Sequence, residues 1–219
     1  MNIGEVLAEI ASYGEFFTIT VGGTGTGWQP VRQVYANGSA DLIDETVRRY
    51  NTTDLRIGAS LVQFSHASRL WSPVLACALG HGMVPDLSGL ERADDGARLR
   101  LPDPVGEPVD RDDPPPDLLY RVVVQQHLEP LAAGLRVKVA AGLLFGNAAS
   151  ALVEASRALQ EARPDLRGPA TRLTESLLAT GRLANAGVLT GPNLAFRRRS
   201  CCLYYRTPAG SMCSDCALA

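Results

Sequence analysis

Four of the five cysteines in this chain of 219 residues lie close together near its C-terminal end, at Cys201, Cys202, Cys213 and Cys216. Their spacing is a vicinal pair, ten intervening residues, and then a Cys-x2-Cys pair. The short gap in the second pair lets both of its thiolates turn toward one metal ion. Adjacent side chains in an extended chain point to opposite faces, so the vicinal pair needs a local twist before both sulfurs can reach a compact cluster. The spacing predicts a metal or redox site built from thiolates.

Three kinds of site could use these thiols. A [2Fe–2S] cluster is favoured, because four cysteines hold such clusters and a compact pair of irons suits the vicinal spacing. Structural zinc is the strongest alternative, although a zinc ion usually takes its ligands from pairs separated by about two to four residues. Disulfides are a weaker alternative, because a reducing cytosol disfavours them.

The expected location follows from the N-terminal residues and from the hydropathy. The segment MNIGEVLAEIASYGEFF contains three glutamates and lacks the basic region that begins a secretion signal. No apolar run approaches the roughly 20 residues of a membrane span, so no transmembrane segment is expected. These features predict a cytoplasmic protein, in which clustered cysteines indicate metal or redox chemistry.

The charge of the chain is nearly balanced overall but uneven along its length. The formal net charge of −2 argues against a nucleic-acid partner, because phosphate backbones require an excess of Lys and Arg. Residues 84–117 contain ten acids and four arginines, whereas residues 182–219 contain five arginines and one acid. The arginines around the cysteines are Arg197, Arg198, Arg199 and Arg206. They could attract an acidic electron donor or an anionic chelate, or they could form a solvated basic strand face.

The remaining polar motifs do not form a nucleotide or hydrolytic site. The stretch GGTGTGW has Trp28 where a dinucleotide loop needs its third glycine, and no Gly-Lys-Ser/Thr follows, so it is predicted to be a flexible loop. His66, His81 and His127 are dispersed in the sequence, and His81 is expected to cap a helix end. Cys77 lies among apolar residues and is expected to be a buried free thiol.

Hydrophobic periodicity predicts a mainly helical α+β fold. Helices are expected over residues 2–13, 39–50, 56–80, 117–135, 138–163 and 169–185, with Pro73 kinking or dividing the third. A strand is expected over 16–21, a hairpin from 84–90 and 97–101 around Asp94-Asp95-Gly96, and a C-terminal strand leading into the loop that carries the cysteines. A turn is expected at Gly191-Pro192-Asn193.

We expect a single domain over residues 1–219. It would consist of an N-terminal segment (1–55), a helical core (56–192) and a C-terminal [2Fe–2S]-binding segment (193–219). An acidic insertion in the core, residues 84–117, is expected to be a solvated flap.

The pattern Cys201-Cys202-x10-Cys213-x2-Cys216 resembles the ferric-siderophore reductase family of the FhuF type. The stretches ASLVQFSHASRLWSPVLACAL (residues 59–79) and LLFGNAASAL (residues 143–152) also resemble segments of its actinobacterial members. Residues 1–50 contribute nothing to the likeness. The resemblance implies that the four cysteines ligate a [2Fe–2S] cluster.

The resemblance also implies a function, the reduction of ferric siderophores. A siderophore holds Fe(III) tightly through hard oxygen donors and Fe(II) far less well, so one electron is enough to release the iron. The chain has no recognisable flavin or nicotinamide site, so we expect an external electron-donor protein, and we expect a monomer. Arg69 and Trp71 could contact the siderophore, although core packing is favoured for Trp71. The alternative function is a zinc-stabilised, non-redox module that binds a siderophore or a protein.

Overall fold

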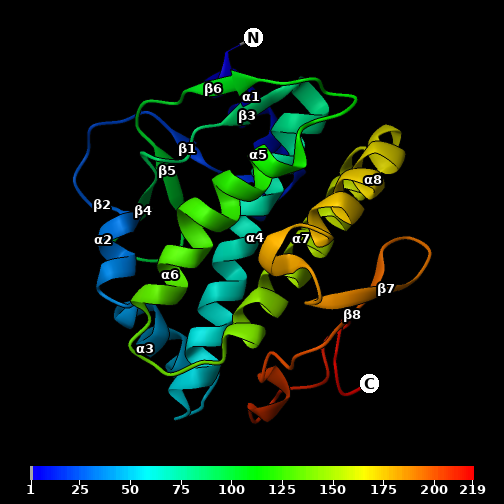
Figure 1. Ribbon diagram of the computed structural model, residues 1–219. Coiled ribbons are helices and arrows are strands. Elements are labelled where there is room, and N and C mark those ends of the chain that lie inside the picture. Colours follow the sequence, from blue (N-terminus) through cyan, green and yellow to red (C-terminus); the bar gives the residue numbers. More distant parts are fainter. Residues whose placement is uncertain (1) are drawn as a thin grey trace.

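Two long helices, α4 (Leu55–His81) and α7 (Ala141–Ala162), pack against each other at the centre of the molecule (Figure 1). The computed structural model describes residues 2–219. It has the mainly helical α+β fold that the sequence predicts, with small sheets beside the helices. None of the helices in the described residues is long and apolar enough to cross a membrane.

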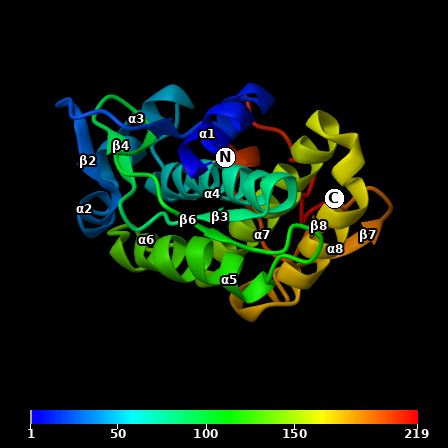
Figure 2. The ribbon, with the colours of Figure 1, turned by 90° about the horizontal axis from the view of Figure 1, so that it is seen from above.

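The shorter helices cover this central pair. α1 (Ile3–Ile10) and α3 (Ala40–Arg49) pack against α4, α8 (Arg167–Leu178) packs against α7, and α2 (Val31–Ala36) packs against α6 (Glu129–Gly134). Seen from above, α4 lies between α1 on one side and α5 (Pro116–Tyr120) with α6 on the other (Figure 2). α3, α4 and α7 lie close to their predicted positions, whereas α2 was not predicted.

α4 has a cap at each end. Asp54 accepts a hydrogen bond from the amide of Arg56 at the N-terminus, and Gly82 takes the left-handed conformation, φ +63°, at the C-terminus. Pro73 lies inside the helix, so the helix is not divided there. The hydrogen bond that the proline cannot donate is offset by packing, because Trp71 and the turns around it are buried.

The strands are short and form three sheets within the described residues. The largest has the order β1 (Thr20–Val21), β5 (Leu99–Leu101), β4 (Glu91–Ala93) and β2 (Trp28–Pro30). β3 (Met83–Pro85) pairs with β6 (Gly106–Pro108). The β4–β5 hairpin turns at the predicted Asp94-Asp95-Gly96, but its first strand is 91–93 and not 84–90, because residues 83–85 pair with β6 instead.

The N-terminal segment differs from its prediction in two places. The predicted strand over 16–21 forms only in its last two residues, as β1. Before it, Glu15–Phe17 form a 3-10 turn, in which the amides of Phe17 and Thr18 bond back to the carbonyls of Gly14 and Glu15. Trp28, the last residue of the stretch expected as a loop, begins β2, because β4 offers Trp28–Pro30 a partner.

The acidic insertion is part of the folded body, so the predicted solvated flap is wrong. Leu87, Leu90, Leu99 and Leu101 are at most 2% exposed and belong to the main hydrophobic core. Its acidic side chains nevertheless face solvent, with Glu91 the partly buried exception. Most of these acids lie in the turns and loops between the short strands, which separates them from the buried leucines.

The predicted helix over 117–135 forms as α5, a π-helical stretch (Arg121–Leu128) and α6 in succession. At the end of the π-helical stretch, the amide of Glu129 bonds to the carbonyl of Val124, five residues back. Pro130 follows and has no amide hydrogen to continue an α-helical ladder. The sequence contains no clear signal for this wider turn.

The chain ends in a hairpin and a loop. β7 (Gly187–Gly191) and β8 (Ala195–Arg198) form the hairpin, which turns at the predicted Gly191-Pro192-Asn193. β8 leads into residues 199–219, here called the cysteine loop, as the sequence predicts. In Figure 1 this red loop lies at the opposite end of the molecule from the N-terminus.

Candidate metal centre

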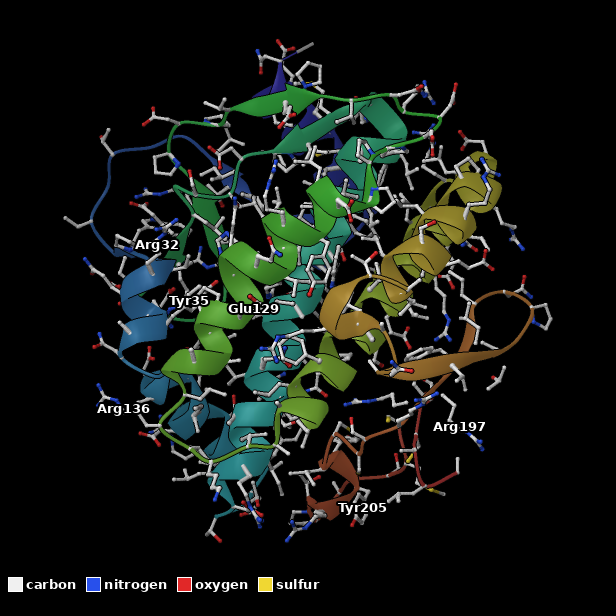
Figure 3. The ribbon with its side chains drawn as sticks, viewed as in Figure 1. Arg32, Tyr35, Glu129, Arg136, Arg197 and Tyr205 are labelled. Carbon is white, nitrogen blue, oxygen red and sulfur yellow. The ribbon has the colours of Figure 1, made fainter. Side chains whose placement is uncertain are left out.

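The cysteine loop brings cysteines from both ends of the motif together. The Sγ atoms of Cys202 and Cys213 are 3.7 Å apart. Cys202 and Cys216 are buried, whereas Cys201 and Cys213 are half-buried. Cys77 is fully buried inside α4 and is not part of this group, as expected. Figure 3 shows Arg197 and Tyr205 on this end of the molecule.

The distance between the sulfurs of Cys202 and Cys213 fits two thiolate ligands of one metal ion. Two ligands of one tetrahedral ion with metal–sulfur bonds of about 2.3 Å are about 3.8 Å apart, which is close to the observed distance between Cys202 and Cys213. The amide of Leu203 donates to Sγ of Cys201 at 3.3 Å, and the amide of Leu218 donates to Sγ of Cys216 at 3.4 Å. Hydrogen bonds to sulfur tune the potentials of iron–sulfur clusters. Among residues 2–219, no set of three or more His, Cys, Asp or Glu side chains is arranged to hold a single metal ion.

The chain turns sharply directly after the vicinal pair. Leu203 has φ +69°, in the left-handed region that non-glycine residues rarely adopt. This conformation turns the chain just beyond the Leu203 amide that donates to Sγ of Cys201. The strain is consistent with a local structure that serves a site.

Arg198 connects the loop to both central helices. Its side chain is 3% exposed, and its guanidinium donates to the Asn147 side-chain oxygen on α7. Asn147 donates to the carbonyl of Ser60 on α4 at 2.9 Å, and the Ser60 hydroxyl donates to the carbonyl of Cys202 at 2.7 Å. Burial lowers the pKa of Arg198, and negative charge on the cysteine sulfurs opposes that shift. An arginine at this position therefore places a positive charge beside the thiols.

A second anchor holds the other end of the motif. Asp215 is 2% exposed and accepts hydrogen bonds from Ser150 Oγ at 2.6 Å and from the guanidinium of Arg157 at 3.3 Å. Both partners lie on α7. The backbone carbonyl of Asp215 also accepts from the amide of Arg198 at 3.1 Å. The Cys213–Cys216 turn is thus fixed on the same helix as Asn147.

The thiol of Cys213 has a raised pKa. Burial raises it to about 12, and the neighbouring Cys202 sulfur adds to the shift. A raised pKa keeps the thiol protonated until a metal binds, and metal binding to such a thiol displaces its proton.

The four arginines around the cysteines have different environments. Arg198 is buried, whereas Arg197, Arg199 and Arg206 are exposed. Arg199 donates to the side chain of Asn185 at 3.3 Å, and Arg206 forms an ion pair with Asp54 at 3.3 Å. The alternation of a strand could have separated Arg198 from its neighbours, because Phe196 and Arg198 share the inward face of β8.

Trp71 and Arg69 have different roles from each other. Trp71 is 0% exposed and belongs to the core, so core packing is confirmed and a surface contact is wrong. Arg69 pairs with Glu15 and lies 5.0 Å from the centre of the Phe16 ring. It therefore holds the 3-10 turn of the N-terminal segment against α4.

Two of the three histidines are brought together, although they are dispersed in the sequence. Tyr35 on α2 (Figure 3) places its hydroxyl 2.6 Å from His66 Nε2 and 3.0 Å from His127 Nδ1. Burial lowers the pKa of His66 to about 3 and that of His127 to about 4, and it raises the pKa of Tyr35. His81 lies apart from this group at the end of α4, 3.7 Å from Glu9.

The comparisons with known proteins agree with this geometry. Residues 198–218 match the family model described as the FhuF 2Fe-2S C-terminal domain, and all four clustered cysteines lie inside the match. No curated protein and no solved structure matches the chain. The match covers the segment that β8 and the cysteine loop build, and it leaves the helical body unmatched. The C-terminal segment of this chain is therefore similar to the 2Fe-2S C-terminal domain of the FhuF type, and its cofactor is a [2Fe–2S] cluster.

Proposed function

We propose that this protein is a ferric-siderophore reductase that passes one electron to Fe(III) in a siderophore complex and so releases Fe(II). The observation that carries the proposal is the family match at residues 198–218, which contains four cysteines gathered in one loop. A bound [2Fe–2S] cluster supplies one electron at a time. Iron release needs no further chemistry, because Fe(II) binds hard oxygen donors far more weakly than Fe(III).

We assign the cluster ligands to Cys201, Cys202, Cys213 and Cys216. Cys201 and Cys213 are half-buried, so their sulfurs lie near the surface, where an electron has a short path to a bound partner. Asp215 and Arg198 hold the two ends of the motif on α7, and Ser60 of α4 donates to the carbonyl of Cys202. The proposal includes a cytoplasmic location, a monomer, and an external electron-donor protein.

The chain's own residues keep the electron-transfer site apart from acid–base chemistry. His66 and His127 are both engaged by the Tyr35 hydroxyl, and both histidines remain neutral near pH 7 because burial depresses their pKa values. The nearest carboxylate of the motif, Asp215, is engaged by Ser150 and Arg157. The siderophore should therefore leave with its covalent structure unchanged.

A single-turnover experiment tests the function. The protein is purified without oxygen, assayed for iron and sulfide, reduced, and mixed in a stopped-flow instrument with ferric hydroxamate or ferric catecholate complexes and an Fe(II) trap. We expect reoxidation of the protein, one trapped Fe(II) for each electron, and intact siderophore by mass analysis. The proposal would be contradicted if none of the ferric chelates reoxidised the reduced protein, or if the siderophore were cleaved. A colourless protein that contains zinc would favour the non-redox module.

A further inference from the structure

A cavity of about 490 Å³ lies directly beside the cysteines. Its walls come from the N-terminal segment 13–17, from α4 and α7, and from the cysteine loop, and Cys202 and Cys213 both line it. Cavities of roughly 300–1,000 Å³ typically hold small molecules. The cavity is named the thiol cavity below.

The lining of the thiol cavity is mainly apolar. Phe17, Leu61, Phe64 and Ala158 contribute to its walls, and Phe16 stands at the mouth with 41% of its surface exposed. Arg69 keeps Phe16 and Glu15 in place by its contact with the Phe16 ring and its ion pair with Glu15. An apolar recess that remains open in a folded chain indicates a ligand with apolar surface.

The charges around the cavity restrict the ligand further. Glu15 lines it from the N-terminal segment and pairs with Arg69, and Glu154 lines it from α7 and pairs with Arg157, so these carboxylates leave no excess of positive charge at the cavity. Arg198, the one cation among the described residues of the lining, is buried and donates to Asn147. A cluster held by four thiolates adds negative charge at the same wall, because the negative charge of its sulfides and thiolates exceeds the positive charge of its two irons. An anionic ligand would therefore be repelled from this side of the loop.

We propose that the thiol cavity is the binding site for the iron chelate, and that it selects chelates with apolar organic arms and without net negative charge. This inference rests on the proposed function and adds the place and the substrate class. The apolar arms pack against Phe16, Phe64 and Ala158, and the ferric centre lies on the side of Cys202 and Cys213. The ferric ion gains one electron that the reduced cluster loses, no bond of the organic ligand breaks, and the donor protein restores the electron.

Gallium(III) complexes separate binding from reduction, because Ga(III) has the charge of Fe(III) and is not reduced. We would titrate the cluster-loaded protein with an uncharged, apolar gallium chelate and with a trianionic one, using calorimetry. We expect the uncharged complex to bind at least about tenfold more tightly, a difference that corresponds to about 1.4 kcal/mol. Equal affinity for both complexes, or tighter binding of the anionic one, would overturn the selectivity.

Two variants locate the site. Ala158→Phe fills the cavity without removing a contact, and Phe16→Ser removes apolar surface from its exposed mouth. Each should weaken binding of the uncharged gallium chelate about tenfold or more while the visible spectrum stays unchanged. Ala162→Phe is the matched control, because Ala162 is exposed on α7 and does not line the cavity. Phe16 is at the surface, so its variant tests the site even if Ala158→Phe fails to fold.

The outcomes distinguish this inference from the function on which it rests. If wild-type protein reduces ferric chelates and Ala158→Phe and Phe16→Ser bind and reduce them equally well, the reductase stands and the cavity is not its chelate site. If an uncharged gallium chelate binds and the variants weaken that binding, but no ferric chelate is reduced, the binding site is supported and the reductase function is contradicted. A small inorganic oxidant such as hexaammineruthenium(III) should reoxidise all variants at the same rate, because it needs no apolar pocket.

Discussion

At the scale of single residues, five cysteines of one chemical type have two different environments. Cys77 is fully buried, and burial alone raises the pKa of its thiol. The other four lie in the cysteine loop, where amides donate to the sulfurs of Cys201 and Cys216, and Cys202 lies next to Cys213. This difference leads to a direct test of the ligand assignment.

Replacing any one of Cys201, Cys202, Cys213 and Cys216 by serine should remove or destabilise the cluster, because serine offers no thiolate. Cys77→Ala should keep the red-brown colour and the full iron and sulfide content. Visible absorption and metal analysis of the five anaerobically purified variants check this. A colourless Cys77→Ala protein beside four coloured serine variants would show that the ligands are misassigned.

Arg198 supplies the buried positive charge beside the cysteines, at 3% exposure. Positive charge favours the more negative reduced cluster, so Arg198→Gln should lower the reduction potential. The expected shift is on the order of 50 mV, equivalent to roughly 1 kcal/mol for one electron.

Arg198→Lys is the control, because it keeps the charge and loses the planar contact with Asn147. A redox titration followed by electron paramagnetic resonance measures both variants. If lysine and glutamine lower the potential equally, hydrogen bonding and not charge is the source of the effect.

At the scale of elements, α2, α4 and the π-helical stretch meet at one buried polar group. Tyr35, His66 and His127 come from these three elements, and His127 is 2% exposed. Burial is the largest cause of both depressed histidine pKa values, and the positive charges of Arg69 and Arg92 at His66 and of Arg32 at His127 act in the same direction. Protonation of either ring would put an uncompensated charge between packed helices.

This group should make the protein sensitive to acid. The folded-state pKa of His127, about 4, lies below the usual 6.5, so between these values the unfolded chain binds a proton that the folded chain does not. The contribution of the neutral histidine to the free energy of unfolding is therefore fully present above about pH 6.5. As the pH decreases toward 4, the free energy of unfolding falls by about 1.4 kcal/mol per pH unit for each such histidine. His66 acts in the same direction, over a window that extends down to its folded-state pKa of about 3.

His127→Gln removes one titrating group and leaves an amide that can bond to the Tyr35 hydroxyl. Between about pH 7 and about pH 5.5, the variant should lose about 1 kcal/mol less stability than the wild type. Urea unfolding followed by circular dichroism at both pH values measures the difference. Parallel losses in both proteins would mean that His127 does not control the acid response.

At the scale of the whole molecule, the surface around the cysteine loop divides into a cavity and a basic strand. The thiol cavity has carboxylates at Glu15 and Glu154, whereas Arg197 and Arg199 are exposed on the strand and at the start of the loop. Opposite charges on these two surfaces favour different partners, and the basic strand suits an acidic electron donor.

Replacing Arg197 and Arg199 together by glutamine should slow reduction by an acidic donor about threefold or more at low ionic strength, and it should flatten the dependence of the rate on salt. Arg136→Gln is the matched control, because Arg136 is also exposed but lies far from Arg197 in Figure 3. Stopped-flow reduction at several salt concentrations gives both quantities. If the kinetics at low salt are unchanged, Arg197 and Arg199 form only a solvated basic strand face and do not assist the donor.

Local sequence determined much of the site and of the helical body. The spacing of Cys201, Cys202, Cys213 and Cys216 identifies a thiolate site without knowledge of the fold, because its chemistry depends on neighbours in the chain. α3, α4 and α7 were predicted from apolar periodicity, since a helix forms from hydrogen bonds within its own segment. The β4–β5 turn at Asp94-Asp95-Gly96 was predicted for the same reason, because turn residues act locally.

Only the tertiary structure decided which distant segments meet. β3 pairs with β6 and not with β4, the next strand in the chain. Pairing depends on where the end of α4 places β3 in the fold, and not on strand propensity alone. Three further features require the packed core. His66 meets His127 through Tyr35, and Arg198 is buried between two exposed arginines. Residues 13–17 close the thiol cavity against Cys202 and Cys213. Such contacts bring together residues far apart in the chain, and their free energy comes from burial that no local pattern encodes.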